Sequence, residues 1–184
     1  MLDGNNHTIS NITSTSGNGV IISQLTGTVR NLYAEHISKT NTGTYNALIG
    51  SANKAAVIEN VHVTDIELAI SNRVGGIIGE LYEAGRITNC SVISILLLDA
   101  LTSNSNSDLM IGGIAGSLTD SIIENSYVQD LNFETEISSI NGMGGVAGLC
   151  QNSTIVNVYA TGIIKANSQN VGGIVGYTGS INLS

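Results

Sequence analysis

The sequence predicts an all-β fold, a single-stranded parallel β-helix or solenoid with three short strands per turn. Two signatures recur together along the 184 residues, and β-branched residues alternate with polar ones between them. A recurring unit of this size is typical of a solenoid, because one unit cannot bury its apolar side alone and stacked units bury a common core. We expect about five full turns in one domain, 1–184, with the right-handed winding that parallel crossovers almost always show.

The first signature is a glycine-rich hexapeptide that begins at Val74, Ile111, Met143 and Val171. Two columns of glycines are predicted: Gly75, Gly112, Gly144 and Gly172 form one, and Gly79, Gly116, Gly148 and Gly176 form the other. The second glycines of each pair are also expected to be structural: Gly76, Gly113, Gly145 and Gly173. Glycine reaches positive φ and lets backbones approach closely, so we expect a corner of the solenoid here. Two earlier turns have Gly19-Val20 and Asn46-Ala47 instead of the glycine pair, which predicts differently shaped corners.

The second signature is Ile-x-Asn, or Val-x-Asn, followed by a short apolar run. Its asparagines are 29, 29, 36 and 32 residues apart: Asn31, Asn60, Asn89, Asn125 and Asn157. A side-chain amide both donates and accepts hydrogen bonds. We expect these five side chains to stack as a structural ladder at a second corner, each bonded to a backbone group and to the asparagine of the next turn. Each net hydrogen bond contributes about 1 kcal/mol.

Each repeat is read as three strands. The first follows the asparagine, the second is an alternating stretch such as Asp65-Ile66-Glu67-Leu68, and the third is the glycine signature. Alternation at every second residue is strand periodicity, and no segment has a helical stripe.

The composition and net charge limit the classes of partner that this chain can bind. Hydrophobic residues make up 42% of the chain and aromatic residues only 4%, so the predicted core is aliphatic. The net charge is −8 and the six basic residues are scattered, which disfavours nucleic acid because phosphate binding needs clustered Lys and Arg. No apolar run approaches the roughly 20 residues of a membrane helix, so we expect no membrane insertion. The chain begins inside a repeat and has no signal-peptide pattern, so we expect a fragment of a larger protein whose signal and anchor lie outside it.

The variable segments precede the glycine signature. The longest runs from Asp99 to Met110 and the next from Glu134 to Gly142. Insertions of a solenoid project from one face, and loops often carry function. The candidate contact surface is therefore these residues: Asp99, Ser103, Asn104, Asn106, Asp108, Glu134 and Glu136. The alternative is a solvated excursion without a partner.

Two cysteines and one aromatic column complete the inventory. Cys90 takes the place of Leu32, and Cys150 takes the place of Leu81 and Leu118. Both should be free, buried thiols, because two turns of strand spacing exceed the reach of a disulfide.

One column, two residues after the asparagine, holds Tyr33, His62, Tyr127 and Tyr159. It either shields a strand face or forms an aromatic strip for sugar or protein contact.

Candidate chemistry is sparse. None of the three histidines is followed by Glu, so the zinc-protease motif His-Glu-x-x-His is absent. A polysaccharide lyase needs clustered carboxylates with a basic residue, and Lys and Arg are scarce near Asp65, Glu67 and Asp130. We expect no catalytic residues, no metal centre and no cofactor, and leave open a weak surface calcium site at these carboxylates or at Glu134 and Glu136.

The paired signatures resemble the GLUG repeat of bacterial surface proteins. The segment Leu2 to Ile12 is similar to the opening turn that often precedes such repeats, so the resemblance covers nearly the whole chain. GLUG repeats occur in large secreted or wall-attached proteins, including adhesin-like proteins and the amino-terminal regions of immunoglobulin A protease-type zinc metallopeptidases. The resemblance implies an extracellular β-helical module and transfers no catalytic site.

Three functions therefore remain open. The first is a non-catalytic scaffold or recognition module that displays a rigid face to a host protein or glycan. The second is the substrate-orienting region of an immunoglobulin A protease-type zinc metallopeptidase, and the third is a polysaccharide-active β-helix enzyme. In each case we expect a monomer, or packing against neighbouring domains of the same chain.

Overall fold

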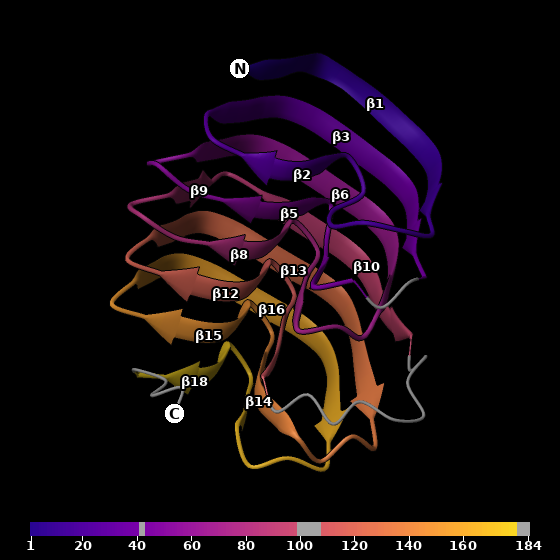
Figure 1. Ribbon diagram of the computed structural model, residues 1–184, viewed down its shortest axis with the longest axis vertical. Helices are drawn as coiled ribbons and strands as arrows, with labels where there is room; N and C mark the ends of the chain where they lie inside the picture. Colours follow the sequence, from indigo (N-terminus) through magenta and orange to yellow (C-terminus); the bar gives the residue numbers. More distant parts are fainter. Residues whose placement is uncertain (41–42, 99–107, 180–184) are drawn as a thin grey trace.

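A computed structural model describes residues 1–40, 43–98 and 108–179 and contains only β-strands in these ranges (Figure 1). The predicted all-β parallel solenoid is confirmed, because every strand pairing is parallel and joins neighbouring turns. Among the described residues, no helix is long and apolar enough to cross a membrane.

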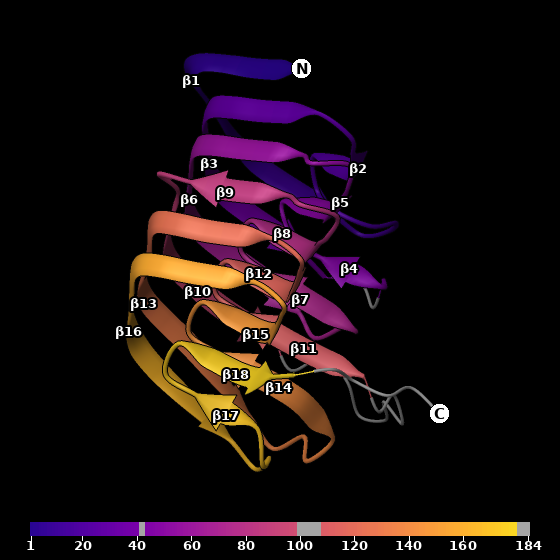
Figure 2. The same ribbon diagram turned by 90° about the vertical axis from the view of Figure 1, so that its left-hand side faces the viewer.

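Three sheets run along the stack, and each turn after the first contributes strands in the order sheet A, sheet C, sheet B, whereas the first turn passes directly from sheet A to sheet B (Figures 1 and 2). Sheet A holds β1 (Leu2–Ser14), β3 (Thr28–Lys39), β6 (Val57–Ala69), β9 (Arg86–Thr88), β10 (Ser91–Leu98), β13 (Ile122–Thr135) and β16 (Thr154–Ala166). Sheet C holds β4 (Tyr45–Asn46), β7 (Arg73–Gly75), β11 (Leu109–Gly112), β14 (Ile140–Gly144) and β17 (Val171–Gly172). Sheet B holds β2 (Ile22–Leu25), β5 (Ile49–Ala52), β8 (Ile78–Leu81), β12 (Ala115–Thr119), β15 (Ala147–Gln151) and β18 (Val175–Thr178).

The strands of one turn are distributed differently from the prediction. In sheet A, the first and second predicted strands form one continuous strand, as in β6, which spans 13 residues. The strand bends twice, at Asn60 and at Asp65, which both have positive φ and are skipped by the ladder of Cα partners. The second bend recurs five residues after the first in most turns, at Asn11, His36, Asp65, Ser94 and Asp130. These residues differ in type, so the sequence did not show that they form a column. A residue in the left-handed backbone conformation bends the strand, and the pairing with the neighbouring strand resumes after the bend.

The glycine signature contains two strands, one in sheet C and one in sheet B. The expectation of positive φ at these glycines was wrong: among the described residues, positive-φ glycines are Gly17, Gly19, Gly162 and Gly179. Close approach is the reason for glycine instead. A Cβ on Gly75 would overlap the carbonyl oxygen of Ile78, where the chain folds back on itself between β7 and β8. A Cβ on Gly76 would lie 2.7 Å from Val92 of sheet A, across the core.

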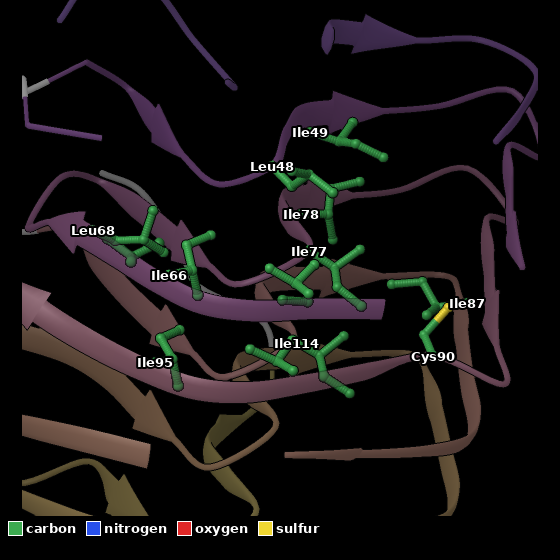
Figure 3. Close-up of a cluster of buried hydrophobic side chains, with 14 of the residues drawn as sticks. Leu48, Ile49, Ile66, Leu68, Ile77, Ile78, Ile87, Cys90, Ile95 and Ile114 are labelled. Atoms are coloured by element: carbon green, nitrogen blue, oxygen red, sulfur yellow. The ribbon is translucent and has the colours of Figure 1, made fainter. Parts of the chain in front are cut away.

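The core is aliphatic, as the composition predicts, and lies between sheet A on one side and sheets B and C on the other. Ile66 and Leu68 of sheet A face Ile77 and Ile78 from the glycine signature, and all four side chains are fully buried (Figure 3). The same positions recur in successive turns, so each turn adds one layer to a continuous interior.

One buried charge interrupts this pattern near the N-terminal end. Lys39 has no exposed surface and occupies the column of Leu68. Its Nζ donates to Ser14 Oγ at 3.0 Å, Ser16 O at 2.8 Å and Gly17 O at 2.9 Å. Burial lowers the pKa of this ammonium group. Its role is to tie the connection after β1 to the stack.

Candidate functional site

The connections between sheets lie in two rows. The connections from sheet A to sheet C are 40–44, 70–72, 99–108, 136–139 and 167–170, and their described residues form the row here called the A–C edge. The row from sheet B to sheet A, here called the A–B edge, consists of 26–27, 53–56, 82–85, 120–121 and 152–153. The A–C connections differ more in length than the A–B connections, and the longest of them exceeds every A–B connection, which makes this edge the candidate contact surface.

Three of the predicted contact residues, Asp108, Glu134 and Glu136, fall on or beside the A–C edge. Asp99, Ser103, Asn104 and Asn106 lie outside the described residues. Glu134 is exposed and forms an ion pair with Lys165, with 3.5 Å between Oε2 and Nζ. Glu136 is exposed at the start of its connection, and Asp108 is partly buried.

Asp108 belongs to a charged cluster that the sequence did not reveal. Arg73 lies 35 residues earlier in the chain and donates from Nη2 to Asp108 Oδ2 at 2.8 Å and from Nη1 to Asp108 O at 2.6 Å. Only 12% of the Arg73 side chain is exposed. The cluster therefore fastens the end of the longest A–C connection to strand β7.

Glu80 and Tyr45 complete this cluster at the re-entrant corner between sheets C and B. The Tyr45 hydroxyl donates to Glu80 Oε2 at 3.0 Å, and Glu80 Oε1 lies 3.8 Å from Arg73 Nε. Burial and the Glu80 carboxylate raise the pKa of Tyr45 to about 12. A hollow of about 160 Å³ lies beside these residues. The carboxylates of Asp108 and Glu80 both interact with Arg73 or Tyr45. Neither carboxylate is therefore left without a partner to act as a general acid or base.

A larger hollow lies farther along the same edge, between the last two A–C connections. It is an open surface hollow of about 480 Å³, lined by hydroxyl and amide side chains that include Ser138, Ser139, Asn167 and Gln169. Two hydrogen bonds join its walls: Ser168 Oγ donates to Ile140 O at 2.6 Å, and Asn170 Nδ2 donates to Asn141 O at 2.9 Å. The hollow is thus formed by the fold before any ligand is present.

The signature asparagines all lie at the first corner of sheet A with positive φ, between 49° and 53°. Asn60 Nδ2 donates to Asn31 Oδ1 at 2.9 Å, and Asn157 Nδ2 donates to Asn125 Oδ1 at 2.7 Å. Asn89 makes no side-chain bond of this kind with another described residue. The acceptor that Asn89 would use, Asn60 Oδ1, already binds His62 Nε2 at 2.9 Å. The ladder therefore has two segments, separated at the third of the five asparagines.

The aromatic column likewise divides into two pairs. Tyr33 and His62 have ring centroids 5.0 Å apart, and Tyr127 and Tyr159 stack at 5.1 Å with nearly parallel planes. Ser91 occupies the turn between the pairs and is buried. Its hydroxyl lies 2.8 Å from His62 Nδ1, which holds the imidazole over the gap. This arrangement shields a strand face and does not form one continuous strip.

The carboxylates considered for calcium do not converge. Asp65 lies at the second corner beside His36, with 3.4 Å between Asp65 Oδ2 and His36 Nδ1, in a surface hollow of about 410 Å³ that Glu67 also lines. Ser94 separates Asp65 from Asp130 in this column. Across the described ranges, no three His, Cys, Asp or Glu side chains are placed to hold a metal ion.

Both cysteines are free, and they occupy different columns as expected. Cys90 is 1% exposed, and its thiol lies 3.2 Å from the carbonyl oxygen of Thr88. The prediction for Cys150 was partly wrong, because this side chain is half-buried near the last A–B turn. The next turn covers it with Thr178 instead of an aliphatic residue.

Comparison with known proteins supports the assignment of the repeat. Residues 70–94 match the family model described as "The GLUG motif". The chain carries a GLUG motif. This motif covers strands β7, β8 and β9 and the first part of β10, so it includes Gly75, Gly79 and Asn89 and the re-entrant corner beside Arg73. The resemblance to GLUG-repeat proteins is confirmed.

Two larger proteins are similar over most of the chain. Halomucin of Haloquadratum walsbyi (strain DSM 16790 / HBSQ001) is 28% identical over 170 residues, which cover 85% of this chain and 2% of halomucin. Immunoglobulin A1 protease of Streptococcus sanguinis is 28% identical over 155 residues, which cover 83% of this chain and 8% of the protease. The GLUG-containing chain thus spans a small part of either relative. No solved structure matches it.

Proposed function

We propose that this chain is a non-catalytic, extracellular β-helix module that acts as a rigid scaffold and presents its A–C edge to a protein or glycan partner. One observation carries the proposal: the turns are held in register by continuous strand ladders, while the polar connections of the A–C edge change in length from turn to turn. A rigid ladder that carries variable loops is the usual arrangement of a recognition surface.

The relatives support an extracellular setting. The two relatives, halomucin and immunoglobulin A1 protease, are secreted or surface proteins. This chain corresponds to a small part of each, so its role is that of a module within a longer surface protein.

The second candidate is a substrate-orienting region of a zinc metallopeptidase, favoured by the similarity to the Streptococcus sanguinis protease. On this reading the A–C edge holds immunoglobulin A1 for a catalytic domain elsewhere in the parent. A polysaccharide-active enzyme receives less support, because the cluster around Arg73 has two carboxylates and both are bound within the cluster.

The proposal is tested by binding of the purified 184-residue protein to a printed glycan array, to immobilised mucin and to immobilised immunoglobulin A1. Glu136→Arg changes an exposed carboxylate at the A–C edge, and Glu83→Arg makes the same charge change at the A–B edge. We expect binding that Glu136→Arg weakens and Glu83→Arg leaves intact. Binding that is equally sensitive to both changes, or absent from every surface, would overturn the proposal.

A further inference from the structure

We infer that the hollow of about 480 Å³ between the last two A–C connections is a binding site for an uncharged sugar chain. The inference rests on the proposed recognition function and names its ligand class. The volume falls within the range of roughly 300–1,000 Å³ that small-molecule sites occupy. Figure 2 shows these connections at the lower end of the stack, after β13 and β16.

The chemistry of the lining favours sugar hydroxyls. Ser138, Ser139, Asn167 and Gln169 line the hollow, and none of these side chains is hydrogen-bonded to another described residue. Hydroxyl and amide groups both donate and accept, which matches a sugar hydroxyl that does the same. A dense set of such groups can therefore bind several hydroxyls of one sugar unit at once.

The charge of the surroundings favours an uncharged sugar. No residue that lines the hollow carries a charge. Glu136 is exposed at the start of the first connection, Glu134 forms an ion pair with Lys165, and the whole chain has a net charge of −8. An acidic polysaccharide would approach against this field and find no guanidinium or ammonium group within the hollow.

The lining disfavours a protein partner at this position. Protein interfaces depend on a few buried aromatic or aliphatic anchors. The apolar side chain in the lining is Ile140, and it is 3% exposed because it packs into the core. The hollow therefore offers hydrogen bonds without an apolar pocket.

The walls are also held in place before binding. The bonds from Ser168 to Ile140 and from Asn170 to Asn141 join the second connection to strand β14, and Met143 N of the same strand donates to Asn170 O at 2.9 Å. Ile137 N donates to Thr135 Oγ1 at 3.2 Å and shapes the first wall. A preformed site loses less conformational entropy on binding.

The test uses the whole 184-residue protein and backbone amide NMR shifts. The probes are uncharged oligomers of glucose, mannose, galactose and N-acetylglucosamine at millimolar concentration, with oligogalacturonate and an uncharged Gly/Ser/Asn peptide as comparisons. The variant Ser138→Arg/Gln169→Arg fills the hollow from both walls at exposed positions. The matched control Thr154→Arg/Val156→Arg adds the same charge at exposed positions of β16, next to the A–B edge.

We expect at least one uncharged oligosaccharide to shift the amides of 138–141 and 167–170. The hollow-filling variant should weaken this binding at least about tenfold, the effect of losing one or two hydrogen bonds. The control should retain it. The inference is overturned if no uncharged oligosaccharide shifts these amides, if the binding survives in the hollow-filling variant, or if the acidic oligomer or the peptide binds there as well.

This result is separable from the proposed function. A partner that remains bound to the hollow-filling variant and is lost with Glu136→Arg would leave the A–C edge as the contact surface and remove the sugar site alone. Loss of all binding to the A–C edge would end both proposals.

Discussion

The side-chain amide nitrogen of Asn60 lies 2.9 Å from the side-chain oxygen of Asn31, one turn earlier in the solenoid. Both residues have positive φ at the first corner of sheet A, where the backbone ladder skips them. The side chains therefore supply a hydrogen bond between turns at a corner that the strand ladder skips. Asparagine suits this position because it tolerates the left-handed region better than other non-glycine residues.

The hydrogen bond between Asn60 and Asn31 predicts that substitutions of Asn60 lower the free energy of unfolding by different amounts. Asn60→Ala removes the ladder bond, the acceptor of His62 and the tolerance of positive φ, so we expect a loss of about 2–4 kcal/mol in unfolding free energy. Asn60→Gly restores the backbone conformation and should lose less than Asn60→Ala. Urea unfolding followed by circular dichroism measures both.

Asn89 is the matched control for this prediction, because it has the same φ and no ladder bond among the described residues. Asn89→Ala should lose only the conformational part, about 1–2 kcal/mol. Equal losses for Asn60→Ala and Asn89→Ala would show that the ladder bonds contribute nothing.

The glycine pair predicts a contrast within one column. A Cβ on Gly113 would overlap the carbonyl oxygen of Gly145 and lie 2.8 Å from Val128, so Gly113→Ala should cost about 3 kcal/mol or more. Gly173 occupies the same column in the last turn and has no atom within 4 Å of its Cβ position. Gly173→Ala should therefore change the thermal midpoint little. Similar destabilisation by both substitutions would contradict close packing as the reason for glycine.

His62 predicts a pH-dependent stability. Burial lowers its pKa in the folded protein. In the unfolded chain the imidazole has a pKa of about 6.5. Below that pH the unfolded chain binds a proton that the folded protein does not, so stability falls as the pH decreases from 6.5 toward the folded pKa, by at most about 1.4 kcal/mol per pH unit.

The variant His62→Gln isolates this contribution, because the carboxylates of both proteins titrate alike. Urea unfolding of the two proteins between neutral and mildly acidic pH should give a steeper loss for the unsubstituted protein. Parallel curves would mean that His62 does not titrate differently on folding.

The cysteines predict unequal reactivity. Burial raises the pKa of Cys90 to about 12, and it also raises the pKa of the half-buried Cys150. Because the thiolate is the reactive form, a disulfide reagent at mildly alkaline pH should label Cys150 slowly in the native protein and Cys90 only after unfolding. Cys90→Ser and Cys150→Ser assign the two phases. Unreduced, unfolded protein with fewer than two reactive thiols would contradict free cysteines.

The sequence alone predicted the repeat, the all-β class and the column in which each signature residue lies. These follow from local rules, because period and alternation decide which side chains face a shared interior. The sequence suggested positive φ as the reason for the signature glycines, but the reason is the close approach of neighbouring backbone. That approach depends on how the chain folds back between β7 and β8 and not on the conformational preference of a single residue. The second corner was missed, since asparagine, histidine, aspartate and serine all occupy it and share no pattern.

The candidate site was accessible to sequence reasoning only in part. Length variation marked the A–C edge, but the bond between Arg73 and Asp108 joins residues 35 positions apart, and the hollow beside Ser138 arises from two connections that meet only when turns stack. The amino-acid order determined which groups repeat. The stacking of turns decided which of them meet, because contacts across neighbouring turns depend on the length of every intervening connection.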